Sequence, residues 1–350
     1  MQTSLIRHLS RRTVVKGGLA IGLTGVVAKH ASVKDVSLKP AASPISYSRD
    51  FTGLVDIGDD RDLYMECRGS GMPTVVLEAG YRSPATVWTD DLVQPAHPRT
   101  MVLPGVAAFT RVCAYDRPGT DVVLDGQLHK SRSTPIPMPR TAQSAVDDLH
   151  TLLQVTDVPA PYVLVGHSLG GLLVRLYAST YPDEVAGLVL VDAWSEALQG
   201  LLTPEQWEAY VHLNSEIPPE IAGDLDYETI DFAAASTAMR QAAETQPLRP
   251  MPLVVLSHAQ PFGVPEDALG FSPEVLERAW ASAQDQLAAL VPHAQHVIAT
   301  ESGHYIQLQQ PDLVIEAVRQ VVEAVRNLGS WGTPEATPIG RKEPDAVYGD

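Results

Sequence analysis

The sequence predicts an α/β protein in which a largely parallel sheet carries helices on both faces. Short apolar runs rich in β-branched residues recur along the chain without polar alternation, as expected for strands buried on both faces. Helical patterns lie between these runs, and such strand–helix alternation is typical of parallel sheets. One interval of about 60 residues is too long for an ordinary crossover and indicates an insertion.

The strand candidates follow one another from residue 51 to residue 300. Residues 51–57 and 62–67 are predicted to form a strand pair joined by the turn Gly58-Asp59-Asp60. The later candidates are single short apolar runs at 74–80, 112–116, 162–166, 187–192, 252–257 and 296–300.

Helical patterns are clearest at 141–154, 272–290 and 311–328. Thr141 precedes the first of these and is a suitable N-cap, because its hydroxyl can accept from an unpaired N–H of the first turn. In 311–328 the apolar residues recur at spacings of three and four, which predicts an amphipathic helix packed on the sheet.

The long interval predicts a helical lid at 194–250 that divides an α/β core into the parts 50–193 and 251–328. Its helical segments are expected near 204–213 and 227–245. Apolar residues at its beginning favour an apolar substrate, although they could equally pack the lid onto the core: Trp194, Leu198, Leu201, Leu202 and Trp207.

The ends of the chain differ in composition from the core. Residues 1–31 combine a basic head with a short apolar, glycine-rich stretch, which is typical of a signal peptide. The head contains SRRTVVK at 10–16, which resembles a twin-arginine export signal, so we expect a protein exported to the periplasm or beyond in a bacterium. A linker is expected at 32–49, and the Gly/Pro-rich residues 329–350 are expected to be a disordered tail.

Charge and cysteine content narrow the function classes. The formal net charge is −17 and no basic patch stands out, which argues against a nucleic-acid partner. After removal of the signal we expect no stable membrane insertion. Cys67 and Cys113 are the only cysteines, and because both fall in predicted strands we expect two buried thiols rather than a disulfide.

Residues 166–170, Gly-His-Ser-Leu-Gly, join a buried strand to an apolar helix. A sharp strand-to-helix turn presents a hydroxyl clear of its own backbone, and it needs small residues two positions before and after the serine. The following helix points its N-terminal N–H groups at the same place, where negative charge would develop. The pattern predicts Ser168 as a nucleophile and the N–H of Leu169 as an oxyanion donor.

At this point the sequence resembles the α/β-hydrolase superfamily, and in particular its lidded serine esterases and lipases, over roughly residues 50–328. The matching motifs are GHSLGG at 166–171, VVLEAG at 75–80, YDRPG at 115–119 and ESGHYIQLQQPDLV at 301–314. The resemblance implies a mostly parallel sheet of about eight strands and a triad that runs serine, acid, histidine along the chain.

His304 is the expected base, because it follows the last strand within the matching loop. The sequence offers more than one candidate for the acid of the triad. Most members of the superfamily carry it just after the strand predicted at 252–257, where this chain has no carboxylate until Glu266 and Asp267. Some members take it from the preceding strand, whose tip here bears Asp192, so Asp192 is the preferred acid and Asp267 or Glu266 the alternative.

The resemblance also implies a second oxyanion donor in the loop after residues 75–80, where Tyr81 N–H is the candidate and its ring could line an acyl pocket. Asp116 and Arg117 of the YDRPG motif are expected to hold the fold. His167 is expected to pack beside the serine, and His258 to be a loop residue.

Together these features predict a serine hydrolase that cleaves a carboxylic ester of a small, apolar substrate through an acyl-enzyme, with no metal or organic cofactor. A lactonase, amidase, thioesterase or carbon–carbon hydrolase would use the same triad. A non-catalytic exported binding protein on this fold is the alternative from another class.

Overall fold

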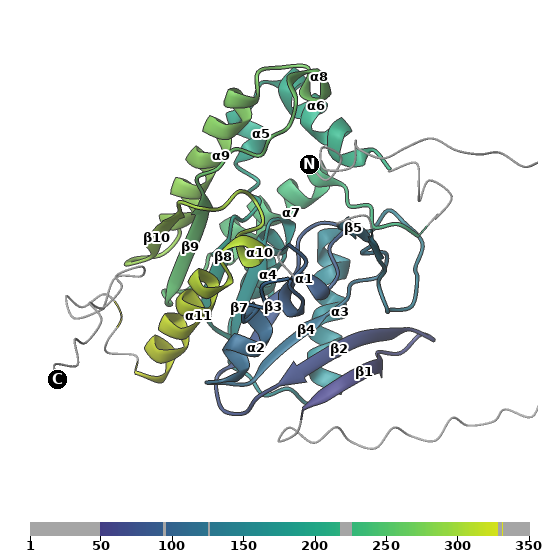
Figure 1. The fold of residues 1–350 in the computed structure, drawn as a ribbon, viewed down its shortest axis with the longest axis vertical. Helices are drawn as coiled ribbons and strands as arrows, with labels where there is room; N and C mark the ends of the chain where they lie inside the picture. The colour runs from purple at the N-terminus through teal and green to yellow at the C-terminus, as the bar shows by residue number, and fades with distance from the viewer. Residues whose placement is uncertain (1–49, 94–95, 125–126, 218–225, 328–330, 332–350) are drawn as a thin grey trace, which may run out of the picture.

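The computed structural model describes residues 50–93, 96–124, 127–217, 226–327 and 331 (Figure 1). The predicted signal peptide and linker at 1–49, and nearly all of the predicted tail, lie outside these ranges. Within them, no helix combines the length and apolar character that crossing a bilayer requires.

An eight-stranded sheet forms the centre of the molecule, in the order β1-β2-β4-β3-β7-β8-β9-β10. The strands β1 and β2 form the predicted antiparallel pair, β2 pairs antiparallel with β4, and every later pairing in the sheet is parallel. The strands are β1 (Phe51–Asp56), β2 (Asp62–Arg68), β3 (Thr74–Glu78), β4 (Val112–Tyr115), β7 (Tyr162–His167), β8 (Val185–Val191), β9 (Leu253–His258) and β10 (Gln295–Ala299). The predicted fold class is therefore confirmed.

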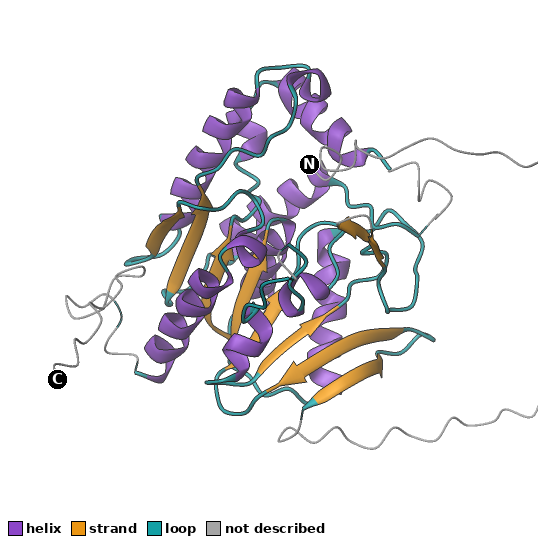
Figure 2. Cartoon of the chain, viewed as in Figure 1, coloured by secondary structure: helices purple, strands orange, loops and turns teal. Residues whose placement is uncertain are grey.

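The strands bury side chains on both faces of the sheet. Successive residues of β3 point to opposite sides, so that Val75 and Leu77 join one apolar cluster and Val76 joins the other. Helices cover both faces (Figure 2). One face packs against α3 (Ala142–Val155), α4 (Leu169–Thr180) and α9 (Pro273–Ala288), and the other against α1 (Thr86–Thr89), α2 (Val102–Ala107), α10 (Ile306–Gln309) and α11 (Pro311–Arg326). The apolar cluster of the first face continues into α5 (Leu198–Leu201), α6 (Pro204–Ser215) and α7 (Phe232–Thr245), which pack on other helices.

The clear helical patterns of the sequence correspond to α3, α9 and α11. Thr141 caps α3 as predicted, since its side chain accepts from the N–H of Ser144. The insertion between β8 and β9 contains α5, α6 and α7. The start of α7 lies at Phe232 rather than residue 227, because the Asp231 carboxylate accepts from two N–H groups of the first turn and begins the helix there.

The sequence analysis missed several short elements. They are α1, α2, α10, the four-residue helix α8 (Glu266–Leu269) and a small hairpin of β5 (Val122–Leu124) and β6 (Gln127–His129). Segments this short hold too few turns to show a periodic pattern.

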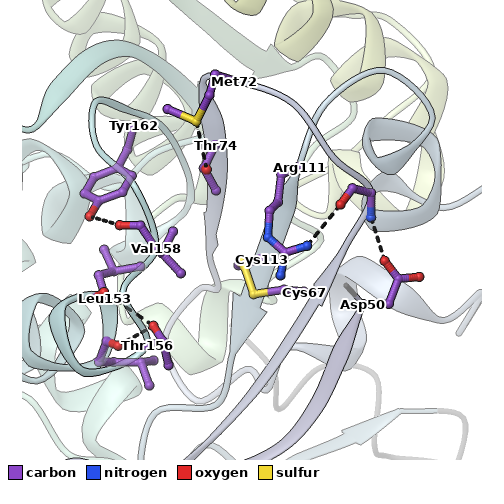
Figure 3. Close-up of a disulfide and its surroundings, with 12 residues drawn as sticks. Asp50, Cys67, Met72, Thr74, Arg111, Cys113, Leu153, Thr156, Val158 and Tyr162 are labelled. Atoms are coloured by element: carbon purple, nitrogen blue, oxygen red, sulfur yellow. Dashed lines mark hydrogen bonds between the residues drawn. A yellow bond between two sulfur atoms is a disulfide. The ribbon is translucent and has the colours of Figure 1, made fainter. Parts of the chain in front are cut away.

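The expectation of two free thiols is wrong, because Cys67 and Cys113 form a disulfide (Figure 3). The two residues stand directly opposite each other on the antiparallel strands β2 and β4, with a Cα–Cα distance of 4.1 Å. A directly opposed pair on neighbouring strands brings two side chains together on one face of a sheet. The sequence shows two cysteines in strands but does not show that those strands are neighbours in this register.

Parallel strands bring their carboxyl ends to one edge of the sheet, and several candidate site residues lie there. Ser168 follows β7, Asp192 follows β8 and His258 ends β9. His304 lies in the loop between β10 and α10.

Candidate active site

Ser168 stands at the turn between β7 and α4 with φ +50° and ψ −123°. This backbone conformation is uncommon for a residue with a side chain and is characteristic of functional sites. Gly166 and Gly170 allow it, because a Cβ at Gly166 would collide with the carbonyl of Gly170, and a Cβ at Gly170 would collide with the carbonyl of Glu78. The side chain of Ser168 is half-buried and lines a pocket at the edge of the sheet.

His304 lines the same pocket and contacts Asp192. Its Nδ1 donates to Oδ2 of Asp192 over 2.6 Å. An Nδ1–H donor fixes the neutral tautomer, so that Nε2 carries the lone pair that can accept a proton. The structure thus brings Ser168, His304 and Asp192 together at the carboxyl edge of the sheet.

Asp192 is fully buried and also has a positive φ, +44°. Besides His304, it accepts from His258 Nδ1 at 2.8 Å, from the His258 N–H at 3.2 Å and from Trp280 Nε1 at 3.0 Å. Burial alone raises the pKa of this carboxyl, but the hydrogen bonds from the two histidines outweigh burial and hold the pKa well below its ordinary value. Asp192 is therefore a buried carboxylate that stays ionised.

The alternative acids lie elsewhere. Glu266 and Asp267 are exposed in the first turn of α8, which contacts α6 of the insertion. Among the described residues, the carboxylate that accepts from the His304 ring is Asp192.

The direction of the Tyr81 N–H follows from the orientation of the peptide group between Gly80 and Tyr81. The carbonyl of Gly80 accepts from Arg117 Nη2 at 2.7 Å. In a trans peptide the carbonyl and the next N–H point in opposite directions, so Tyr81 N–H points away from Arg117. Gly80 lies close to Ser168, because a Cβ added at Gly80 would stand 3.2 Å from Cβ of Ser168. Neither Tyr81 N–H nor Leu169 N–H has a hydrogen-bond acceptor in the part of the chain that the structure describes.

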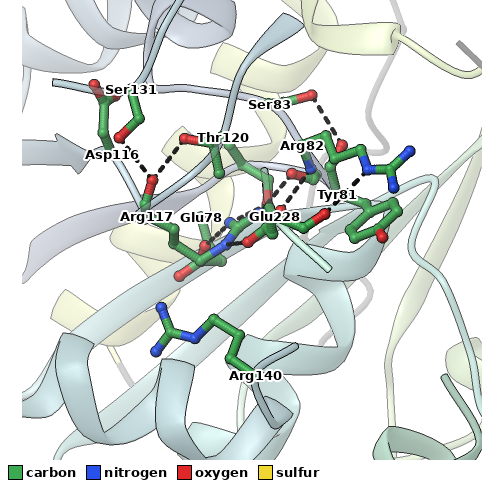
Figure 4. Close-up of polar contacts among 12 residues, drawn as sticks. Glu78, Tyr81, Arg82, Ser83, Asp116, Arg117, Thr120, Ser131, Arg140 and Glu228 are labelled. Atoms are coloured by element: carbon green, nitrogen blue, oxygen red, sulfur yellow. Dashed lines mark hydrogen bonds and ion pairs between the residues drawn. The ribbon is translucent and has the colours of Figure 1, made fainter. Parts of the chain in front are cut away.

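Arg117 holds this loop through a buried ion-pair cluster (Figure 4). Its guanidinium contacts the carboxylates of Glu78 and Glu228 and also donates to the carbonyl of Ala79 at 2.8 Å. Glu228 in turn accepts from the N–H of Arg82 at 2.6 Å. Arg117 thus holds the fold, as expected, and specifically the candidate oxyanion loop.

Asp116 has a comparable structural role. Its carboxylate accepts from the N–H of Ala85 at 2.8 Å and from the Nε of Arg132 at 2.7 Å. Glu228 was missed by the sequence analysis, because an isolated glutamate within an insertion carries no signal of its contact with Arg117.

His167, next to the serine, donates from Nε2 to the carbonyl of His304 at 2.9 Å. Burial, followed by the proximity of His304, lowers the pKa of His167 to about 3. His167 is therefore a neutral residue that ties the strand before the serine to the histidine loop, in agreement with the packing role expected for it.

Half of the residues that line the pocket carry aromatic or apolar side chains. They are Tyr81, Leu169, Trp194, Tyr210, Leu213, Phe232, Trp280 and Tyr305. The Tyr81 ring packs edge-on against Phe232, with centroids 5.2 Å apart, so that the oxyanion loop and the insertion meet above Ser168.

The apolar residues at the start of the insertion have different positions. Trp194 lines the pocket, whereas Leu198 and Leu202 are buried in the main apolar cluster. Trp207 packs on Tyr210 with ring centroids 5.8 Å apart, and Leu201 is exposed. Of the five residues in the predicted apolar set, Trp194 therefore lines the pocket and the other four do not.

Comparison with known proteins agrees with this architecture. The model of the alpha/beta hydrolase family matches residues 75–317, more than half of the chain, and the protein belongs to this family. The protein is accordingly a hydrolase.

Individual relatives are distant. The chain is 24% identical to a probable transporter, efuK, of Hormonema carpetanum, a match that covers 80% of this chain but only 44% of that protein. It is 28% identical to the pimeloyl-[acyl-carrier protein] methyl ester esterase of Xanthomonas oryzae, over 55% of this chain and 79% of that enzyme. Among solved structures, mouse alpha/beta hydrolase domain-containing protein 10 matches with a TM-score of 0.52 at 15% identity, covering 79% of this chain and 99% of that one, which is a likeness of fold.

Proposed function

We propose that the protein is a serine hydrolase that cleaves a carboxylic ester through an acyl-enzyme. The observation that supports this most directly is the pocket shared by Ser168 and His304, with His304 hydrogen-bonded to the buried carboxylate of Asp192. A hydroxyl, a base of fixed tautomer and an acid that orients the base are the groups that nucleophilic acyl transfer requires.

In the proposed reaction, Oγ of Ser168 attacks the ester carbonyl and His304 Nε2 takes the hydroxyl proton. The N–H groups of Tyr81 and Leu169 stabilise the oxyanion of the tetrahedral intermediate. His304 then protonates the departing alkoxide, and in the second half of the reaction it deprotonates the water that attacks the acyl-enzyme. Asp192 remains ionised throughout and stabilises the imidazolium.

A carboxylic ester is favoured over other acyl substrates for two reasons. Aromatic and apolar side chains make up half of the pocket lining, which suits an apolar acyl or alcohol group. The relative from Xanthomonas oryzae is named as a methyl ester esterase. Lactones, amides, thioesters and activated carbon–carbon bonds would react at the same groups and are alternative outcomes of the test below.

We expect a fluorophosphonate probe to label the purified protein on Ser168 with a stoichiometry near one. A panel of p-nitrophenyl esters of graded chain length, together with lactones, thioesters and anilides, should then show the highest kcat/KM for an ester. Absence of both labelling and turnover would contradict the proposal and favour a binding protein on this fold. Labelling combined with a preference for another panel member would keep the nucleophile and change the substrate class.

We further propose that the protein is exported from a bacterial cell. The motif at 10–16 motivates this, although it lies outside the described residues. The Cys67–Cys113 disulfide supports it, because disulfides persist mainly in oxidising compartments.

Replacing both Arg11 and Arg12 by lysine should trap an unprocessed precursor in the cytoplasm, because twin-arginine export depends on that pair. The measurement is the size and location of the protein in fractionated cells. Arg7→Lys is the matched control, since it makes the same change outside the pair, and it should leave export unaffected. Normal processing of the double variant would show that this route is not used.

A further inference from the structure

His258 is a second histidine on the candidate acid, and the triad described above does not use it. It ends β9, the strand after which most members of the superfamily carry the acid, and its side chain is 7% exposed. Its Nδ1 lies 2.8 Å from Oδ2 of Asp192, and its Nε2 lies 3.0 Å from Oε2 of Glu277. Both ring nitrogens thus face carboxylate oxygens.

This geometry defines the charge of the ring. Ionised carboxylates accept hydrogen bonds and donate none, so each contact requires an N–H on the imidazole side. A neutral imidazole has one N–H and could satisfy only one of the two contacts. The two carboxylates together therefore select the doubly protonated, cationic form of His258.

We propose that His258 is a positioning residue of the hydrolase, held as an imidazolium between Asp192 and Glu277, that fixes the triad carboxylate and disfavours protonation of His304. The proposal rests on the proposed function for its effect on catalysis. The positive charge of His258 rests on the two carboxylate contacts alone.

His258 positions the Asp192 carboxylate through the hydrogen bonds that reach each of its two oxygens. The His258 N–H and Trp280 Nε1 both donate to Oδ1, at 3.2 and 3.0 Å. The His258 ring spans both oxygens, at 2.9 Å from Oδ1 and 2.8 Å from Oδ2. The carboxylate is therefore fixed against rotation, with Oδ2 directed at His304.

The electrostatic effect follows from two imidazoles that share one carboxylate. A proton added to His304 creates a second cation on Asp192, and the positive charge already on His258 opposes it.

The charged and titratable groups around His258 are of both signs, and the two carboxylates in direct contact with its ring dominate. Glu277, Arg278 and Asp285 come from α9, and His296 comes from β10. Phe262 and Trp280 pack against the ring, with centroids 4.5 and 6.5 Å away. Burial lowers the pKa of His258, but the hydrogen bonds to Asp192 and Glu277 outweigh burial and raise it to about 9.

A second cavity gives His258 its own access to protons. It is lined by His258, Glu277 and His296 among others, whereas Ser168 and His304 line the first pocket. Trp280 lines both cavities and stands between them. The charge of His258 can therefore respond to pH while a substrate occupies the pocket of Ser168.

The deciding experiment compares the pH profile of kcat/KM for wild type and His258→Asn. The asparagine amide can keep an N–H directed at Asp192 but carries no charge. We expect the acid limb of the profile to move to higher pH by about 0.5–1 unit, because protonation of the base is no longer opposed. Glu277→Gln keeps His258 and its contact with Asp192, so its acid limb should stay closer to the wild-type position than that of His258→Asn.

His296→Gln is the matched control, because His296 lines the second cavity and hydrogen-bonds Ser257 at 2.7 Å rather than Asp192. Its acid limb should not move. If His258→Asn lowers kcat without moving the limb, the histidine only packs against the site and the electrostatic proposal is wrong.

A second readout needs no enzyme activity and so separates this proposal from the proposed function. The folded-state pKa of about 9 lies above the ordinary value of 6.5, so protonated His258 stabilises the fold fully below about pH 6.5 and loses this contribution as pH rises through 9. Wild-type Tm should therefore fall between pH 7 and pH 10 relative to the Tm of His258→Asn. Parallel Tm curves for the two proteins would show that His258 is not held as a cation.

Discussion

Ser168→Ala is expected to lower kcat by a factor on the order of 10⁶, because loss of a serine nucleophile removes the acyl-enzyme route altogether. The hydroxyl is held at a strained strand-to-helix turn with φ +50°, a conformation that the absence of side chains at Gly166 and Gly170 allows and that does not depend on the hydroxyl. The variant should therefore fold normally. Turnover of the best ester and fluorophosphonate labelling test the predicted loss of activity. A thermal melt tests whether the variant folds normally.

Ser257→Ala is the matched control for this experiment. Its Oγ lies 2.7 Å from Nε2 of His296, whose Nδ1 lies 3.4 Å from Asp285, so the chain contains another serine hydrogen-bonded to a histidine. That serine lies within β9 and lines the second cavity, where no strand-to-helix turn presents it. We expect full activity from Ser257→Ala. More than a few per cent of wild-type turnover in Ser168→Ala would show that Ser168 is not the nucleophile.

The sequence predicts those parts of the site that depend on local order along the chain. Ser168 is recognisable because a buried apolar strand, two glycines and an apolar helix all fall within 18 residues, 161–178. The position of Asp192 at a strand end can be predicted because the carboxyl ends of parallel strands share one edge. The fold class follows from the same repetition of apolar runs.

The local order of residues along the chain does not predict contacts between distant segments. The disulfide depends on β2 and β4 being neighbours with Cys67 opposite Cys113, a register that neither strand specifies alone. Glu228 reaches Arg117 from the insertion, 111 residues further along the chain. His258 could have been noticed, because it ends a buried strand at the carboxyl edge of the sheet, but its two carboxylate partners come from the residue after β8 and from α9.

The triad acid is the part of the site where sequence order leaves two choices and geometry favours one. Asp192 is fully buried and accepts from the His304 ring, whereas Glu266 and Asp267 are exposed on α8. The cost of burying a carboxylate is large, and four hydrogen bonds at Asp192 offset it. A buried carboxylate with no catalytic role could also be maintained in this way, so the assignment needs a kinetic test.

Asp192→Asn should lower kcat by roughly 10⁴, because the amide no longer stabilises the imidazolium and can place its N–H against Nδ1, which favours the wrong tautomer of His304. Asp267→Asn and Glu266→Gln are the matched controls and should each retain nearly full activity. The loss in Asp192→Asn should fall on kcat with little change in KM, since the carboxylate is buried beneath the pocket and does not line it.

Stability must be separated from catalysis here, because Asp192→Asn also replaces the acceptor for His258 and Trp280. Long incubation with the fluorophosphonate counts folded sites, and turnover is then expressed per labelled site. A loss of about 10⁴ per site identifies Asp192 as the acid, because unfolding would reduce the number of sites and leave the rate at each one unchanged. The assignment is wrong if Asp267→Asn or Glu266→Gln loses activity while Asp192→Asn turns over at nearly the wild-type rate per site. The acid would then come from the segment after β9, and the hydrogen bond between Asp192 and His304 would have only a structural role.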